Sequence, residues 1–286
     1  MKTVGYYNGK INTIEELSLP VNDRAVYFGD GVYDVAVAEN YRPFALEDHI
    51  NRFFCSLKQL EIPFEMEKGH LHGLIQELLN KLDAPGNAMI YWQASRGTAP
   101  RSHLFPGTGV KANLLIMISP FNTPKELKTI HLITTPETRY SYCNVKTINL
   151  IPNIMAAQKA ASQGCDEAVF HKDGIVSECA HSNIHILKNG ILHTAPTDGK
   201  ILPGITRMHM LALAQKLSIP VIESAFTVSD LMAADEVLIS STTGLIRRAD
   251  HVDGVPVGGK DPQTLSLLFN EYIEQFLRET QNTLNP

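Results

Sequence analysis

The stretch Tyr140-Ser-Tyr-Cys-Asn-Val-Lys-Thr-Ile-Asn-Leu-Ile151 contains a single charged side chain, Lys146, and no other charge lies between Arg139 and Lys159. An ammonium group among apolar neighbours tends to lose its proton, because desolvation disfavours the charged form, and a neutral amine can attack an aldehyde. These are the properties of a lysine that forms a Schiff base. The alternative is a surface lysine on a half-buried strand, with its stem packed and its head in water.

Length and composition are those of an ordinary globular protein of about two domains. The chain has 286 residues, 44% of them hydrophobic, so it can bury a large core. The formal net charge of -5 does not favour binding to nucleic acid or to an anionic membrane, which both attract positively charged surfaces. We therefore expect small molecules as partners, with no nucleic acid and no membrane.

The four cysteines are scattered and form no C-x-x-C pair, which indicates neither a zinc site nor a disulfide framework. The N-terminal residues 1–9 lack an apolar signal core, and no uninterrupted apolar stretch approaches about 18 residues. We therefore predict a soluble, cytoplasmic protein with free thiols and without a metal site.

Strand and helix signals alternate in a way that predicts an α+β fold rather than a doubly wound parallel sheet. Apolar residues at helical spacing predict helices over residues 50–60, 71–82 and 265–276. Hairpin dipeptides, typical of antiparallel sheet, occur at Asn8-Gly9, Asp30-Gly31, Asp173-Gly174, Asn189-Gly190 and Asp253-Gly254. The run Gly29-Asp-Gly31 resembles half of a dinucleotide fingerprint, but no third glycine opens a helix, so a hairpin turn is favoured.

A break between two domains is predicted at Ser119-Pro-Phe-Asn-Thr-Pro-Lys125, which carries two prolines and follows the apolar strand Leu114–Ile118. We expect an N-terminal α/β domain over residues 1–119 and a C-terminal domain over residues 124–286. The linker between them would lie at about residues 120–123.

The segment Leu202-Pro-Gly-Ile-Thr206 passes from a Pro-Gly turn into a predicted helix. Backbone N–H groups at a helix start attract anions, so Ile205 and Thr206 could hold a phosphate. Ser240-Ser-Thr-Thr-Gly244 follows a strand-like run and offers hydroxyl groups for the same anion. The alternatives are an ordinary capped helix and an ordinary loop.

Glu178 closes a hairpin-like stretch and is followed by uncharged residues up to Lys188. A carboxylate that faces a pyridine nitrogen keeps that nitrogen protonated, which lets the ring accept electrons from a carbanion. A Schiff-base lysine, an acid for the ring nitrogen and a phosphate site together describe pyridoxal phosphate. The alternative for Glu178 is a solvated carboxylate at a strand end.

Seven blocks occur in order along nearly the whole chain. They are Asp23-Arg with Phe28-Gly-Asp-Gly-Val-Tyr33, His49-Ile-Asn-Arg52, Arg96-Gly-Thr-Ala-Pro-Arg-Ser-His103, Val145-Lys-Thr-Ile-Asn-Leu150, Val176-Ser-Glu178, Leu202-Pro-Gly-Ile-Thr206 and Ser240-Ser-Thr-Thr243. Through these blocks and their order, the chain resembles the class IV, fold-type IV pyridoxal-phosphate aminotransferases, and most of all the D-amino-acid (D-alanine) aminotransferases. The resemblance implies two α/β domains with the cofactor site at their interface, the C-terminal domain binding the cofactor.

The resemblance also implies roles for individual residues. Lys146 would form the Schiff base with pyridoxal 5'-phosphate and carry the proton at the substrate α-carbon, and Glu178 would pair with the ring nitrogen. The other cofactor contacts would come from Arg52, Leu202, Ile205, Thr206 and Thr242.

The substrate carboxylate would be bound by Tyr33, Arg101 and His103, the last two reaching in from the second subunit of a homodimer. Without the resemblance, Arg52 would be a solvated arginine and Tyr33 a packed aromatic, and Arg101 and His103 would be an exposed loop pair. Three histidines match nothing in the family pattern and are expected to be structural or exposed: His70, His72 and His131.

The resemblance implies transamination between a D-amino acid, D-alanine or D-glutamate, and a 2-oxo acid. The alternatives are a branched-chain L-amino-acid aminotransferase or an aminodeoxychorismate lyase of the same fold, and a non-catalytic protein that holds the cofactor. Pro100-Arg-Ser-His103 argues against the first two. Two departures from the family pattern leave the preferred side chain open: Cys179-Ala-His181 and Gly244-Leu-Ile-Arg-Arg248.

Overall fold

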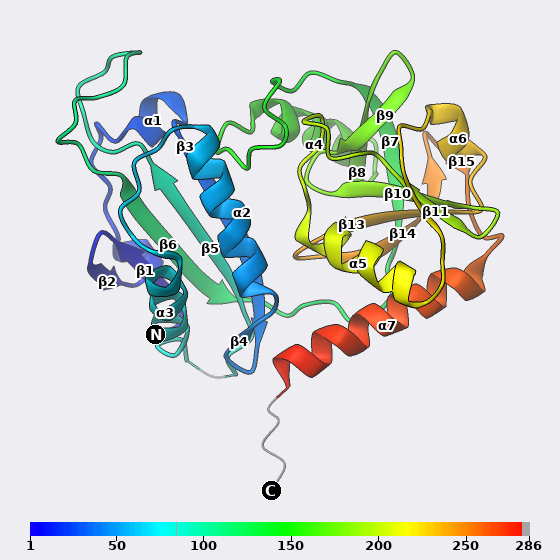
Figure 1. Cartoon of the computed structure of the whole chain (residues 1–286), viewed down its shortest axis with the longest axis horizontal. Helices are drawn as coiled ribbons and strands as arrows, with labels where there is room; N and C mark the ends of the chain where they lie inside the picture. The colour runs from blue at the N-terminus through cyan, green and yellow to red at the C-terminus, as the bar shows by residue number, and fades with distance from the viewer. Residues whose placement is uncertain (84, 282–286) are drawn as a thin grey trace, which may run out of the picture. The chain divides into compact units, whose positions relative to one another are not determined.

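The structure is a computed structural model that describes residues 1–83 and 85–281 and divides them into two compact units. Unit 1 comprises Met1–Thr123, Val145–Asn149 and the described residues from 277 on, and unit 2 comprises Pro124–Asn144 and Leu150–Phe276. Each unit is built on its own sheet (Figure 1). The division into domains 1–119 and 124–286 stays a prediction, and residues 84 and 282–286 of these ranges lie outside the described residues.

Within its described residues, unit 1 has an antiparallel sheet of six strands in the order β2-β1-β6-β5-β3-β4. The strands are β1 Val4–Tyr7, β2 Lys10–Asn12, β3 Gly31–Glu39, β4 Arg42–Pro43, β5 Ala88–Ser95 and β6 Asn113–Pro120. Helices α2 (Leu46–Gln59) and α3 (Lys68–Leu79) pack against this sheet and bury Phe53, Leu71 and Trp92 in a common core (Figure 1). The helices predicted over 50–60 and 71–82 are confirmed.

The short helix α1 (Arg24–Phe28) precedes β3, and it shows that one hairpin prediction was wrong. Gly29 ends α1 in the left-handed conformation, with φ of 60°, and Gly31 already begins β3. A glycine at a helix end supplies this conformation without a steric cost, which explains Gly29. Gly31 has a different reason, because a Cβ there would lie 2.6 Å from the Ala94 carbonyl oxygen. Instead of turning a hairpin, Asp30 accepts hydrogen bonds from Arg24 and Arg96, at 2.7 and 2.9 Å.

The other four hairpin dipeptides are confirmed. Each connects two neighbouring strands with positive φ at both of its residues, as a tight two-residue hairpin turn requires. The turns are Asn8-Gly9, Asp173-Gly174, Asn189-Gly190 and Asp253-Gly254.

Unit 2 has a larger mixed sheet in the order β12-β11-β10-β13-β14-β7-β8-β9, with β15 paired to β14. The strands are β7 Thr129–Pro136, β8 Glu167–Lys172, β9 Ile175–Cys179, β10 Asn183–Lys188, β11 Ile191–Thr194, β12 Val221–Glu223, β13 Glu236–Ser241, β14 Leu245–Val252 and β15 Val255–Pro256. The helices are α4 Ile151–Ser162, α5 Ile205–Lys216, α6 Val228–Met232 and α7 Pro262–Thr280, whose residues from 277 on belong to unit 1. Antiparallel pairs are the majority, as expected for the α+β class, but β7 lies parallel to both β8 and β14, and β11 lies parallel to β12.

No helix in the described part of the chain combines the length and the apolar character needed to cross a membrane. The four cysteines, all within the described residues, are free thiols.

Candidate functional site

Lys146 lies in the segment Val145–Asn149, which belongs to unit 1 and is not part of a strand. The backbone N–H of Tyr33 donates to the carbonyl of Lys146 at 2.9 Å. The N–H of Lys146 in turn donates to Ser56 Oγ at 3.2 Å. Because Val145 is also buried in the unit 1 core, the backbone of Lys146 is held against both β3 and α2.

The amine of Lys146 lies against a pair of tyrosines. Its Nζ is 3.4 Å from the Tyr33 hydroxyl and 4.4 Å from the centroid of the Tyr33 ring. The Tyr33 ring stacks on Tyr91 of the adjacent strand β5, with 5.4 Å between the centroids. Burial raises the pKa of Tyr91, which therefore stays neutral and donates to Gln93 Oε1 at 2.7 Å. The structure thus brings together the predicted Schiff-base lysine and the predicted substrate tyrosine.

Arg52 is buried in α2 and has a carboxylate partner that the sequence analysis did not foresee. Its Nε and Nη2 donate to the two oxygens of Asp34 at 2.9 and 2.7 Å. Asp34 follows Tyr33 on β3 and therefore points to the opposite face of the sheet. His49 Nδ1 lies 2.8 Å from Asp34 Oδ1. Asp34 thus orients the guanidinium of Arg52, whose role as a phosphate ligand stays a prediction.

Burial and neighbouring charges set the protonation of this cluster. Burial alone would raise the pKa of Asp34, but the charge of Arg52 and the hydrogen bond from His49 hold it well below its usual range. Burial lowers the pKa of His49 and outweighs the hydrogen bond and the charge of Asp34, which would raise it. The cluster therefore contains an ionised aspartate, a neutral histidine that donates from Nδ1, and a charged arginine.

In unit 2, Glu178 lies on β9 and is buried among hydrogen-bond donors. The backbone N–H of Leu202 donates to both carboxylate oxygens at 3.1 Å. Asn183 Nδ2 donates to Oε2 at 2.8 Å and also to the Leu202 carbonyl at 2.9 Å. The guanidinium of Arg139 donates to Oε1. Glu178 is therefore a positioned, buried carboxylate and not a solvated strand end.

Arg139 is a site residue that the sequence analysis missed. It donates to Glu137 from Nε and Nη2 at 2.9 and 2.6 Å, and its guanidinium lies 4.6 Å from the centroid of the Phe170 ring. Burial would lower the pKa of Arg139, but the hydrogen bond with Glu137 and the charge of Glu178 raise it above its ordinary value. Arg139 is the last charged residue before Lys146 in the sequence. Its separation of 39 positions from Glu178 gave no sign that the two side chains meet.

The turn into α5 has the features of an anion site. The N-cap is Gly204, and no side chain accepts a hydrogen bond there, while Ile205 and Thr206 are buried. A Cβ at Gly204 would lie 2.0 Å from Asn183 Oδ1, so only glycine lets this turn pack on Asn183. Asn183 thereby connects the Glu178 carboxylate to a helix start whose N–H groups and dipole favour an anion. Asn183 was also missed from the sequence.

Thr242 lies in the turn between β13 and β14 and is partly exposed. The two hydroxyl groups before it are bound within unit 2, because Ser240 Oγ lies 2.8 Å from His185 Nε2 and Ser241 Oγ accepts from the Gly244 N–H at 3.1 Å. Burial lowers the pKa of His185 to about 3, so its ring is neutral. The roles of Thr242, and of Leu202, Ile205 and Thr206 toward a cofactor, stay predictions.

Arg101 and His103 lie in the exposed loop between β5 and β6. The guanidinium carbon of Arg101 is 5.1 Å from the centroid of the Phe28 ring, and the His103 ring centroid is 5.3 Å from the same point. Arg24 Nη1 holds the loop by donating to the Ser102 carbonyl at 2.7 Å. These contacts place both side chains at the end of α1, and their action on a partner subunit's substrate stays a prediction.

The Asp34–Arg52 pair gives a prediction for stability. Replacing Asp34 with Asn should lower the free energy of unfolding by about 3–5 kcal/mol at neutral pH, because Arg52 loses its buried countercharge. The pKa of Asp34 is lowered by folding, so its contribution is present above the unfolded value of 3.8 and is lost as the pH falls below it. The difference between parent and Asp34→Asn should therefore shrink below pH 3.8.

Denaturant unfolding at a series of pH values measures this difference. Glu65→Gln is the control, because Glu65 forms an exposed pair with Lys111, and its loss should cost about 0–1 kcal/mol. A difference between parent and Asp34→Asn that stays constant with pH would contradict the ion pair.

Comparisons with known proteins identify the family of the chain. The family model for amino-transferase class IV matches residues 31–252. The D-alanine aminotransferase of Listeria monocytogenes is 36% identical over 271 residues, which cover 92% of this chain and 93% of that protein. The corresponding protein of Staphylococcus epidermidis is 32% identical over 275 residues, covering 96% and 97%.

Solved structures show the same fold. The branched-chain aminotransferase of Thermoproteus uzoniensis has a TM-score of 0.87 at 24% identity, over 98% of this chain and 96% of that chain. The branched-chain amino acid aminotransferase of Escherichia coli has a TM-score of 0.86 at 24% identity, over 99% and 97%. These likenesses confirm the predicted fold-type IV architecture. The family match over residues 31–252 and the relatives at 36% and 32% identity show that the chain belongs to the class IV aminotransferases.

Proposed function

We propose that this chain is a pyridoxal-phosphate-dependent transaminase that moves an amino group between a D-amino acid, D-alanine or D-glutamate, and a 2-oxo acid. The observation that carries the proposal is the position of the Lys146 amine, 3.4 Å from the Tyr33 hydroxyl, in a chain of this family. The D-alanine aminotransferases at 36% and 32% identity support the choice of D-amino acids.

The donor groups of the two units fit pyridoxal 5'-phosphate chemically. An amine suits its aldehyde, a buried carboxylate suits its ring nitrogen, and a helix start without a side-chain cap suits its phosphate. When bound, the cofactor supplies an electron sink for the negative charge that develops at the substrate α-carbon. The residues that would hold it are Lys146, Arg52, Glu178, Leu202, Ile205, Thr206 and Thr242.

The surroundings of two of these residues, Lys146 and Glu178, support a specific task for each. Lys146 moves the proton at the substrate α-carbon, and the Tyr33 hydroxyl keeps its amine in one place. Glu178 keeps a proton on the ring nitrogen, because Arg139 and Asn183 fix the carboxylate and hold its negative charge. Such preorganised groups lower the barrier without reorganising during the reaction.

Arg101 and His103 would bind the substrate carboxylate together with Tyr33, in the active site of a partner subunit. Both side chains are exposed, and a guanidinium binds a carboxylate through two parallel hydrogen bonds. Fixing the carboxylate on one side decides which enantiomer presents its α-hydrogen to Lys146. The proposal therefore includes a homodimer. A cytoplasmic location fits the free thiols.

A branched-chain L-amino-acid aminotransferase is the second candidate. Solved structures of that activity share the fold at 24% identity, which supports the architecture and not the substrate. An aminodeoxychorismate lyase is the third candidate. A structure with that name from Legionella pneumophila, with a TM-score of 0.83 at 23% identity, supports the shared fold and not the activity.

The stereochemical part is tested by the rate of glutamate formation from 2-oxoglutarate, with D-alanine, L-alanine or L-leucine as the amino donor. D-alanine should be the better substrate, and neither L-alanine nor L-leucine should exceed it. Arg101→Ala should lower kcat/KM for D-alanine by about ten- to a hundredfold, because a charge-assisted hydrogen bond worth about 1.5–3 kcal/mol is lost. Lys111→Ala removes a charge from the end of the same loop and should leave kcat/KM unchanged. Faster turnover of L-leucine would replace the proposal with the branched-chain candidate.

The role of Glu178 is tested separately. Glu178→Gln should retain the cofactor but lower kcat by about a hundredfold or more, because a neutral amide no longer stabilises the protonated ring. Cofactor content by absorbance and steady-state kinetics measure the two effects. Glu77→Gln, in an exposed pair with Lys81, is the control. An unchanged kcat in Glu178→Gln would remove Glu178 from the reaction.

A further inference from the structure

His131, Asp250 and His251 form a cluster of metal-ligating side chains on the sheet of unit 2. None of them has a task in the proposed transamination. The ligand atoms of the three residues lie within 4.8 Å of one another. His131 Nε2 is 3.2 Å from Asp250 Oδ1, and His251 Nδ1 is 2.9 Å from the same oxygen.

An irregularity in β14 creates this cluster. In the parallel pair of β7 and β14, Ala249 lies opposite Ile130 and His251 lies opposite His131. The register therefore shifts by one residue, and Asp250 is the extra residue of a β-bulge.

The bulge turns two consecutive side chains to the same face. Ala249 and Val252 both belong to the hydrophobic core on one face of the sheet, although residues three apart in a regular strand face opposite sides. Asp250 and His251 are consequently both directed to the other face. His131 faces that side too, because the residues before and after it lie in the same core as Ala249.

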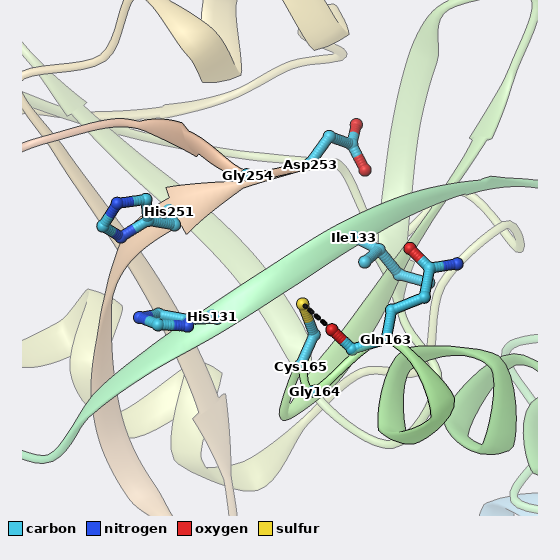
Figure 2. A pocket seen from close by; sticks show the side chains of 8 residues that line it. All are labelled: His131, Ile133, Gln163, Gly164, Cys165, His251, Asp253 and Gly254. Carbon is cyan, nitrogen blue, oxygen red and sulfur yellow. Dashed lines mark hydrogen bonds between the residues drawn. The ribbon is translucent and has the colours of Figure 1, made fainter.

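The cluster is open to ions from solution. The side chains of His131, Asp250 and His251 are 51%, 33% and 37% exposed. Figure 2 shows the two histidine rings lying one above the other on neighbouring strands, at a pocket of about 390 Å³. Ile133, the loop at residues 163–165 and the turn at residues 253–254 line the rest of this pocket, and Asp250 lies beside it rather than in its lining.

The polar side chains near the cluster form hydrogen bonds with other residues. Asp253 accepts hydrogen bonds from the N–H and the hydroxyl of Thr134, both at 2.7 Å. Asp166 accepts from the N–H of His131 at 2.9 Å and so fixes that histidine. The thiol of Cys165 is directed to the Gln163 carbonyl at 3.8 Å (Figure 2).

We propose that His131, Asp250 and His251 bind a divalent transition-metal ion, with Zn²⁺ as the representative, and that solvent completes the coordination. Two imidazole nitrogens and a carboxylate oxygen suit zinc, cobalt or nickel, whereas magnesium and calcium prefer sites made of oxygen alone. Donors on one tetrahedral zinc ion lie about 3.4 Å apart, given metal-ligand distances of about 2.0–2.2 Å. The two nitrogens lie 3.2 and 2.9 Å from Asp250 Oδ1, close to this value, and all three ligand atoms lie within 4.8 Å of one another.

The ion would join β7 to β14 at the point where their register shifts. It would stabilise the folded chain, because it binds the assembled strands and not the unfolded chain. The site does not depend on the proposed transaminase activity.

Calorimetric titration of the cofactor-loaded full chain with Zn²⁺, in a buffer without phosphate, tests the proposal. The parent should bind one ion per chain in this site. His131→Ala, His251→Ala and Asp250→Asn should each raise the Kd by about tenfold or more. Zn²⁺ should also raise the Tm of the parent but not that of the variant carrying both histidine substitutions. Circular dichroism without metal establishes that the variants fold.

Matched controls separate this site from nonspecific binding. His70→Ala and His72→Ala, at exposed histidines of α3, and Cys165→Ser should leave the isotherm unchanged. Transamination by the His131 and His251 variants should equal that of the parent. The proposal is overturned if the parent shows no saturable binding, if the double histidine variant binds as the parent does, or if Cys165→Ser abolishes binding.

Discussion

The hydrogen bond from the Tyr33 N–H to the Lys146 carbonyl, at 2.9 Å, fixes the lysine on which the proposed chemistry depends. The residues on either side of Val145–Asn149 belong to unit 2, so the chain joins unit 1 for this short segment. Further bonds secure the segment, because Asn149 Nδ2 donates to the Gly29 carbonyl at 2.6 Å and the Ile148 N–H to the Gly31 carbonyl at 3.2 Å. A backbone held at several points presents its amine to Tyr33 without the entropy cost of ordering a free loop.

Unit 2 positions its groups by the same principle. Glu178, Arg139 and Asn183 form a buried network in which every member has a charged or hydrogen-bonded partner. A buried network of this kind is rigid when its members are satisfied and costly when one is removed. Asn183 extends it to Gly204 and the start of α5, so the carboxylate and the candidate anion site are fixed relative to each other within the unit. This preorganisation is what an enzyme needs for charges that develop only during the reaction.

Sequence signals that act locally predicted much of the fold. The helical spacing of apolar residues identified α2, α3 and α7, and turn dipeptides identified four hairpins, because both patterns depend on neighbouring residues. Partners distant in sequence could not be predicted. Arg139 meets Glu178 39 positions later, and Arg52 meets Asp34 18 positions earlier. The cluster at His131 was also missed, because it exists only through a one-residue shift between two strands.

The most direct test of the central claim is to find where the cofactor attaches. Incubation with pyridoxal 5'-phosphate, reduction with borohydride, and peptide mass spectrometry identify the lysine that carries the pyridoxyl group. We expect one labelled peptide, containing Lys146, and no label in Lys146→Ala. Label on another lysine, such as Lys159, with Lys146 unmodified would contradict the proposed function, as would a fully active parent without a labelled lysine.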